Sequence, residues 1–235
     1  DIEPDLLLDL QDKHTRKLAL DRQLEDIPRQ LKALDDKKAA EEAAFAAAQD
    51  RLKDLEVKRT TLDGQLKDLE AQVVKYKNQQ LDVKKNEEYQ ALEHEIANLG
   101  EKISALEDDE LTVMMEIDEA KSELAAKQAE HTVRLDALAR ERELYLSKKA
   151  ELEAQAGEVE AAYQSARQSI PKKWLNAYDQ ALNRAKRPPI LVTVSADHRC
   201  QGCYLKVSGE TFSDVRKSND PAFCDQCGRL LYWAG

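Results

Sequence analysis

The sequence has little of what builds one large globular core. Aromatic residues make up 5% of its 235 positions, and it contains only seven glycines and six prolines. Charged residues, in contrast, make up 35%, which is typical of long exposed helices. No apolar run reaches the roughly 18 residues that a membrane-spanning helix needs, and the first residues show no signal-peptide pattern. We therefore expect a mainly α-helical protein with no membrane span.

Cysteine is also scarce, and its placement is informative. The four cysteines form two CxxC pairs near the end of the sequence and are not scattered as in a disulfide framework. Disulfide-rich scaffolds belong to oxidising compartments. We therefore expect a cytoplasmic protein.

Most of the chain is occupied by two runs with a coiled-coil rhythm. Apolar residues recur at alternating steps of three and four over many turns, which is the pattern of a coiled-coil seam. The first run includes Leu52, Leu55, Leu62, Leu66, Leu69 and Val73, and the second includes Leu92, Ile96, Leu99, Ile103, Leu106 and Val113. The pattern predicts two long helices over residues 5–78 and 87–165.

The two runs match each other in reverse order. If Tyr76 faces Tyr89, the residue numbers of every further facing pair have the same sum, out to Phe45 with Ala120. An antiparallel hairpin requires such a constant sum, so we expect a hairpin with its tip near residues 79–86. No proline or glycine marks the tip, and one continuous helix that pairs with a second chain remains the alternative.

Several residues interrupt the seam. Proline removes a helical hydrogen bond, so Pro28 predicts a kink or a break. Arg59 and Glu110 are polar residues in neighbouring layers, and we expect them to approach each other and fix the register. The helical histidines are isolated, and we assign no catalytic or metal-binding role to His14, His94 or His131.

Charge divides the chain into two parts. Residues 170–235 contain ten basic and six acidic side chains, whereas the rest of the chain is strongly acidic. This difference in sign suggests different partners for the two parts. We predict a coiled-coil domain over residues 1–169 and a second domain over residues 170–235 with a short amphipathic helix before the cysteines.

The cysteine spacing predicts a metal site. Cys200, Cys203, Cys224 and Cys227 form a C-x2-C-x20-C-x2-C pattern, in which two turns supply four thiolates to one tetrahedral Zn²⁺. Four protein ligands leave no open position, so the predicted zinc is structural. The alternatives are a redox CxxC pair, a rubredoxin-like iron site, and a site in which His198 replaces one cysteine.

Basic and aromatic residues surround the predicted zinc site. Such a surface can contact phosphates and stack bases, although the aromatic residues can equally form the core of a small module. The candidate residues for binding a partner or a nucleic acid are Lys172, Lys173, Arg184, Lys186, Arg187, Arg199 and Arg229.

Two motifs resemble a known family, the bacterial coiled-coil proteins that end in a C4-type zinc ribbon. The first is the CxxCGRxLY ending over residues 224–232, together with the CxGC turn at residues 200–203. The second is the expected tip, where residues 83–96 are similar to the family pattern V-x-N-x-x-EY-x-x-L-x-x-EI. Its residues at the tip are Lys84, Lys85, Asn86, Glu88 and Tyr89.

The resemblance implies a function without catalysis. It implies that the four cysteines hold one structural Zn²⁺ and that the protein is an adaptor for protein partners, namely the RNA polymerase sigma-54 factor, flagellar proteins and type III secretion components. It also implies a role in transcription regulation, with RNA as a further ligand. A structural spacer, a homo-oligomeric scaffold and an electron-transfer protein remain alternatives. The sequence contains no glycine-rich phosphate loop or nucleophile motif of an enzyme.

Overall fold

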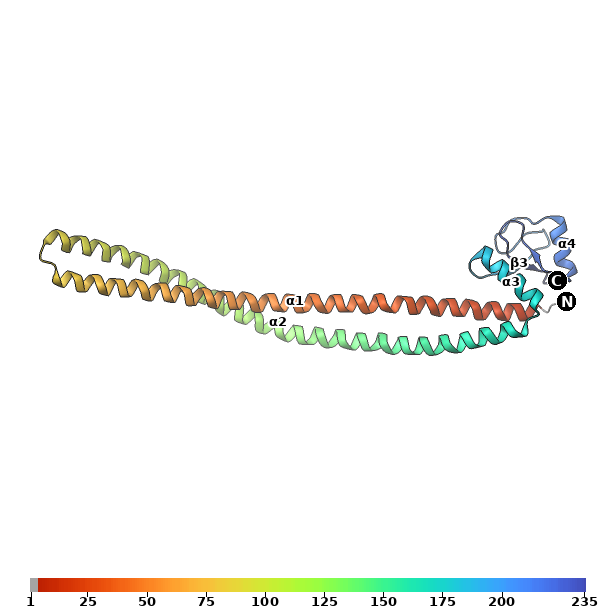
Figure 1. Ribbon diagram of the computed structural model, residues 1–235, viewed down its shortest axis with the longest axis horizontal. Coiled ribbons are helices and arrows are strands. Elements are labelled where there is room, and N and C mark those ends of the chain that lie inside the picture. The colour runs from red at the N-terminus through yellow and green to blue at the C-terminus, as the bar shows by residue number, and fades with distance from the viewer. Residues whose placement is uncertain (1–3) are drawn as a thin grey trace. The chain divides into compact units, whose positions relative to one another are not determined.

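The computed structural model describes residues 4–235 (Figure 1). The elements, in chain order, are α1 (Pro4–Asp82), α2 (Asn86–Ser169), α3 (Lys172–Ala185), β1 (Leu191–Thr193), α4 (Gly209–Lys217), β2 (Ala222–Phe223) and β3 (Leu230–Tyr232). Among these described residues, no helix carries an apolar stretch long enough to cross a membrane.

Helices α1 and α2 run antiparallel and are joined by the short loop 83–85 (Figure 1). This confirms the long hairpin, and both helices extend beyond the ends expected from the sequence. At the tip, the Tyr89 amide donates to the carbonyl of Lys85 at 3.1 Å. Gln80 Nε2 donates to the carbonyl of Tyr89 at 3.3 Å, which links the two helices directly beside the loop.

The chain contains two compact units. The hairpin unit comprises Ala33–Glu141, and the base unit comprises the residues up to Lys32 together with Arg142–Gly235. Both long helices contribute residues to both units.

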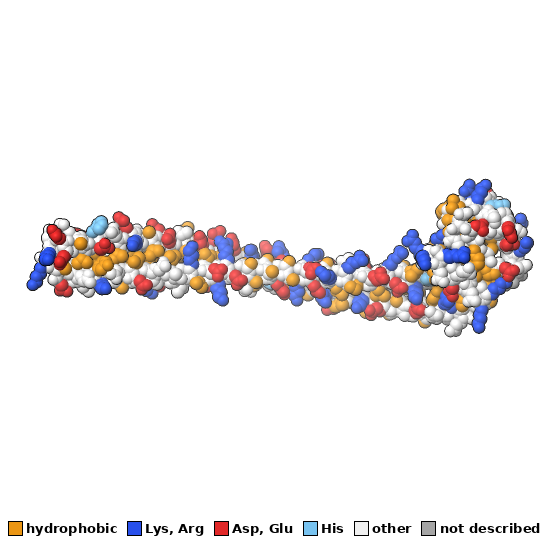
Figure 2. All heavy atoms as spheres, turned by 45° about the horizontal axis from the view of Figure 1, so that its top comes forward, with side chains coloured by type: hydrophobic (Ala, Val, Ile, Leu, Met, Phe, Trp, Pro, Cys, Tyr) orange, Lys and Arg blue, Asp and Glu red, His pale blue; other side chains and the backbone are white. Residues whose placement is uncertain are grey.

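A narrow apolar seam holds the hairpin unit together. Leu62, Val113 and Ile117 are buried in one cluster, and Leu55 and Leu106 pack against it. Burying one such side chain fully contributes about 1.5–3 kcal/mol. Arg59 Nε lies 3.8 Å from Glu110 Oε1, which confirms the expected approach of these two residues. In Figure 2 the apolar side chains near the tip form a band bordered by charged ones.

The observed register differs from the expected one, because Leu62 is buried with Val113 and Ile117 and not with Ile103. The ring of Phe45 stacks on the ring of His131, with centroids 4.5 Å apart, so the expected pairing of Phe45 with Ala120 is wrong. Phe45 lies in the alanine-rich residues 39–48 of α1, and small side chains there place few steric limits on the facing helix. The aromatic contact therefore decides the local register.

Pro28 does not break α1, which is continuous from Pro4 to Asp82. Of the kink or break that the sequence predicts, the break is therefore wrong. In the base unit, Leu20 and Ile27 are buried against Leu152 of α2, and Leu24 and Leu31 pack beside them. Because these apolar contacts lie on both sides of Pro28, packing offsets the hydrogen bond that proline removes.

The base unit has a second core that joins the start of α1 to residues of the C-terminal part. Leu7 and Leu10 of α1 are buried together with Tyr178 of α3, Ile190 and Leu230. Residues 170–235 thus share one hydrophobic core with the two long helices.

The side chain of Gln11 adds a polar link between α1 and β1. Its Oε1 accepts from the amides of Ile190 at 2.6 Å and Leu191 at 2.7 Å. Its Nε2 donates to the carbonyl of Leu191 at 3.1 Å. One glutamine side chain therefore satisfies the backbone groups that an edge strand would otherwise leave unpaired.

The remaining residues form a small zinc-ribbon region. Its three-stranded sheet has the order β1-β3-β2, with β1 parallel and β2 antiparallel to β3. Helix α4 lies between the two cysteine pairs and was not expected from the sequence. Its start carries a recognisable signal, because Ser208 caps the helix by accepting from the amide of Thr211 at 3.1 Å.

Candidate metal centre

Two turns of the ribbon bring the four cysteines together. All four Sγ atoms lie within 4.8 Å of one another. The Sγ atoms of Cys200 and Cys227 are 3.8 Å apart, and those of Cys203 and Cys224 are 3.7 Å apart. A tetrahedron with Zn–S bonds of about 2.3 Å has edges of about 3.8 Å. The arrangement therefore fits a zinc ion bound by four thiolates.

The two cysteine turns repeat the same backbone pattern. In the first knuckle, the amide of Cys200 donates to the carbonyl of Leu205 at 3.0 Å, and the amide of Tyr204 donates to the carbonyl of Cys200 at 2.7 Å. In the second knuckle, Cys224 donates to Arg229 at 2.8 Å and Gly228 donates to Cys224 at 3.0 Å. Tyr204 and Gly228 therefore hold equivalent positions.

Both equivalent positions have a left-handed backbone, with φ of 66° at Tyr204 and 73° at Gly228. At Gly228 a side chain is also excluded, because a Cβ there would lie 2.5 Å from Arg184 Cδ. At Tyr204 a bulky residue adopts a conformation that costs about 1–2 kcal/mol for an L-residue. The first knuckle thus carries a side chain where glycine suits the backbone better.

The thiols have contrasting pKa values. Burial raises the pKa of the Cys200 thiol to about 12 and also raises the pKa of Cys224. At Cys227 burial opposes ionisation, but hydrogen bonds from the backbone and side chain of Arg229 and from neighbouring thiols lower its pKa to about 7. Bound Zn²⁺ supplies the positive charge that keeps all four sulfurs as thiolates.

Arg229 supports the first knuckle from the second. Its Nε donates to the carbonyl of Pro189 at 2.7 Å. A Cβ on Gly202 would lie 2.5 Å from Arg229 Cδ, so the arginine lies directly over the first turn. Arg229, one of the residues predicted to bind a partner, therefore contributes to the metal site itself.

His198 is not among the residues grouped at the metal site. Its ring stacks on Phe212 with centroids 3.9 Å apart. Four thiolates close the coordination shell and leave no position for a reacting water. The site therefore holds a structural Zn²⁺ and does not have the open geometry of a catalytic one.

The other basic residues predicted to bind a partner form two groups. Lys173 bonds to the carbonyl of Asn219 and pairs with Asp220, and the Arg184 guanidinium lies over Phe223. Arg199 Nε bonds to Asp197 at 3.0 Å, and its Nη1 bonds to the carbonyl of Tyr204 at 3.0 Å. These three residues thus already have partners inside the base unit. A second group of basic residues is exposed on the surface: Lys172, Lys186 and Arg187.

The predicted tip residues belong to the hairpin unit and not to the metal site. The following tip residues are exposed: Lys84, Lys85, Asn86, Glu88 and Tyr89. Beside them, Leu81 is 84% exposed although it is aliphatic. The structure therefore places the two groups of predicted binding residues in different units of the chain.

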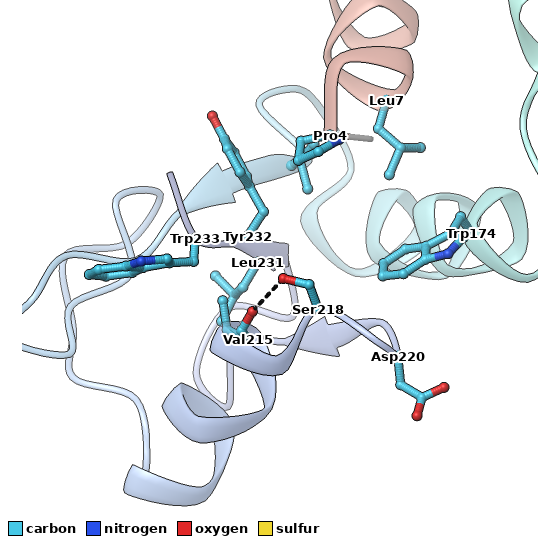
Figure 3. A pocket seen from close by; sticks show the side chains of 10 residues that line it. Pro4, Leu7, Trp174, Val215, Ser218, Asp220, Leu231, Tyr232 and Trp233 are labelled. Atoms are coloured by element: carbon cyan, nitrogen blue, oxygen red, sulfur yellow. Dashed lines mark hydrogen bonds between the residues drawn. The ribbon is translucent and has the colours of Figure 1, made fainter. Parts of the chain in front are cut away.

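A small cavity lies beside the ribbon (Figure 3). Leu7, Trp174 and Leu231 contribute apolar walls, and Ser218 and Asp220 line its polar side. The cavity volume of about 30 Å³ has room for a water molecule or a methyl group but not for a substrate.

Sequence reasoning missed two residues that position the site. Gln11 is 180 positions away from Leu191, and no local pattern connects them. Tyr204 directly follows the first cysteine pair, and comparison with Gly228 after the second pair was the available signal.

Two family models match the chain. A C4-type zinc ribbon domain matches residues 199–231, and a CT398-like coiled-coil hairpin domain matches residues 8–186. None of the curated proteins compared with the chain matches it.

Solved structures share the fold at low sequence identity. CT398 from Chlamydia trachomatis is 18% identical with a TM-score of 0.84, over 97% of this chain and 96% of that one. The HP0958 protein from Helicobacter pylori is 16% identical with a TM-score of 0.57, over 98% and 97%. A protein from Mycobacterium smegmatis is 17% identical with a TM-score of 0.58, over 96% and 97%. Because the coiled-coil model matches most of the sequence, the chain belongs to the family of CT398-like coiled-coil hairpin domain proteins.

Proposed function

We propose that this chain is a non-catalytic, cytoplasmic, zinc-binding adaptor that binds protein partners. The observation that carries this proposal is the closed four-thiolate centre, which stabilises a small surface module and offers no position for a substrate. A long coiled coil joined to a rigid module is suited to holding proteins and not to converting small molecules.

The partners we propose are the RNA polymerase sigma-54 factor, flagellar proteins and type III secretion components, with transcription regulation as the outcome. The motifs at the tip and at the second cysteine pair support this choice through their resemblance to sigma-54-associated proteins. The charge distribution also favours a protein. The acidic long helices repel a nucleic acid, which could therefore contact only residues 170–235, where ten side chains are basic and six are acidic.

RNA binding is the second candidate function. The Arg216 guanidinium lies 6.0 Å from the ring centroid of Phe212 and 5.9 Å from that of Trp233. A cation beside partly exposed aromatic rings is the arrangement that binds phosphates and stacks bases.

Binding to purified sigma-54 factor and to single-stranded RNA, each at low and physiological salt, separates the two candidates. Affinity for RNA should fall steeply with salt because each neutralised phosphate releases counterions. A protein interface with an apolar centre should change far less. We expect sigma-factor binding that survives physiological salt. Absence of sigma-factor binding, together with RNA binding that survives physiological salt, would reverse the order.

Charge variants sharpen this test. Replacing Lys172, Lys186 and Arg187 with alanine should weaken RNA binding and reduce its salt dependence. A matched control replaces three exposed lysines of the hairpin unit, Lys77, Lys84 and Lys85, with alanine. If both sets of changes weaken binding equally, the effect is due to net charge and not to a site on residues 170–235.

A further inference from the structure

The outer face of α2 in the hairpin unit exposes two apolar side chains one helical turn apart. Leu111 is 58% exposed and Met115 is 73% exposed, whereas Val113 and Ile117 are buried in the seam with Leu62 of α1. Each exposed residue lies two positions from a buried one, which is about 200° around the helix. Leu111 and Met115 therefore point away from α1, and the packing of the two helices does not account for them.

Both methionines of the chain lie here, because Met114 is half-buried directly beside Met115. Methionine is unbranched and polarisable, so it adapts its shape to the group that contacts it. For this reason it is frequent on surfaces that bind helical segments of partners. The composition of this apolar pair and its half-buried neighbour is therefore typical of a contact surface.

Exposed acids border the apolar pair at both ends. They precede Leu111 by four and three positions or follow Met115 by three and four, spacings that place them on the same side of the helix. These four exposed acids are Glu107, Asp108, Asp118 and Glu119. Together with Leu111 and Met115 they form the acidic patch, which extends about 18 Å along α2.

The negative charge of this part of the hairpin unit is not compensated by its neighbours. Residues 107–119 contain seven acidic side chains and no basic one. Among the described residues, Glu110 is the one acid of these seven that forms an ion pair, and its partner is Arg59. On α1, residues 51–68 surround Arg59 and contain five basic and four acidic side chains. The two stretches together therefore have a net charge of −6.

This charge decides which class of ligand the patch attracts. Nucleic acids and anionic membrane surfaces are themselves negative, so the patch repels them. A basic protein segment is attracted, and an apolar side chain of the same segment would cover the exposed apolar pair. An amphipathic helix with a basic border presents both kinds of side chain on one face.

We infer that the acidic patch docks a basic amphipathic helix of a protein partner. This inference rests on the proposed adaptor function and assigns the chemistry of one partner to a face of α2. Because the apolar pair is small and its acids are exposed, attraction between charges supplies much of the affinity. Binding should therefore weaken as salt screens these charges.

The test uses the intact, zinc-loaded chain with isotope-labelled methionine methyl groups. Because the chain contains two methionines, at positions 114 and 115, both methyl signals in NMR report on the patch. The probe is a synthetic helical peptide of lysine and leucine with its leucines on one face. One control is a scrambled peptide of the same composition, and another has glutamate in place of lysine. We expect the amphipathic basic peptide alone to shift both signals.

Neutralising the patch tests the role of its charge. The variant combines Glu107→Gln, Asp108→Asn, Asp118→Asn and Glu119→Gln. It should weaken peptide binding about tenfold in titration calorimetry and flatten the salt dependence. The matched control neutralises two glutamates and two aspartates that are exposed elsewhere in the hairpin unit, through Glu70→Gln, Asp82→Asn, Glu93→Gln and Asp136→Asn.

A second variant tests the apolar contact. Leu111→Gln combined with Met115→Gln retains good helix formers and should also weaken binding about tenfold. Val133→Gln, at a position of the hairpin unit that is 68% exposed, is the control and should bind as the wild type does.

Several outcomes would overturn the inference. Equal weakening by the neutralised patch and its control would show that the peptide responds to net charge alone. Unshifted methionine signals in the presence of bound peptide would place the site elsewhere. Equal binding of the scrambled peptide would remove the amphipathic helix as the ligand. Methionine signals that shift with the concentration of the chain alone would make a second copy the occupant.

Failure of this inference and failure of the proposed function are distinguishable. If the peptide binds at the patch and sigma-54 factor does not bind the chain, the patch is supported and the sigma-54 assignment is removed. If sigma-54 factor binds and the peptide does not, the patch is refuted and the adaptor function remains.

Discussion

The hairpin unit and the base unit are stabilised by contacts of different kinds. In the hairpin unit, a row of apolar side chains such as Leu62, Val113 and Ile117 repeats along two helices. The base unit depends on a few contacts between residues distant in sequence and on a metal site. Repetition makes the first unit tolerant of local change, whereas the second should respond strongly to the loss of one ligand or one polar contact.

Loss of the metal should have the largest effect. Cys227→Ser should reduce zinc content from about one equivalent per chain to near zero, because apparent binding free energies of structural zinc are about 10–16 kcal/mol and are coupled to folding. The ribbon should unfold while helicity is largely retained. Zinc analysis and far-UV circular dichroism measure the two effects, with Gln226→Ser in the same knuckle as control. A large loss of helicity would show that residues 1–169 do not fold independently of residues 170–235.

Removing the polar link between α1 and β1 should have a smaller effect. Gln11→Ala leaves the amides of Ile190 and Leu191 without their acceptor, which should lower the free energy of unfolding by about 1–3 kcal/mol. Denaturant unfolding and hydrogen exchange at these two amides measure the change. Arg16→Ala, at an exposed position of the same helix, is the control. Unchanged exchange at both amides would contradict the assigned role.

The base unit should also lose stability in acid. His14 is buried, and its Nδ1 lies 3.2 Å from the hydroxyl of Tyr178. Burial, followed by the charges of Lys17 and Arg167, lowers the pKa of His14, while Asp179 acts in the opposite direction.

A lowered histidine pKa means that the unfolded chain binds a proton first as pH falls. The contribution of His14 should therefore be complete above pH of about 6.5 and should decline as pH falls below it. Thermal unfolding as a function of pH measures this decline, and His14→Gln should reduce it. His94→Gln, at an exposed position, should leave it unchanged. If His14→Gln loses as much stability in acid as the wild type, the decline is due to other titratable groups.

The smallest effect is expected in the hairpin unit. Arg59 and Glu110 are 47% and 20% exposed and lie 3.8 Å apart, so a double-mutant cycle should give a coupling energy of about 0.2–1 kcal/mol. Replacing both with leucine should maintain or raise stability while loosening the register. Spin-label distances between the helices report the register. Zero coupling energy would remove the pair as a register determinant.

The sequence alone determined the periodic parts of this protein. Leu62, Leu66, Leu99 and Ile103 follow a local rhythm, so the two helices, their antiparallel course and the position of the loop could be predicted. The CxxC pairs likewise predicted zinc, because metal chemistry limits which ligands and spacings work.

Only the tertiary structure decided the remaining features. The pairing of Phe45 with His131 depends on ring stacking beside alanines that do not enforce a register. Gln11 reaches β1 from a position remote in sequence, and Tyr204 becomes informative once its backbone matches that of Gly228. Local periodicity encodes which face of a helix is buried. It does not encode which distant residue meets that face, because that choice is made by packing and hydrogen bonding among all the elements together.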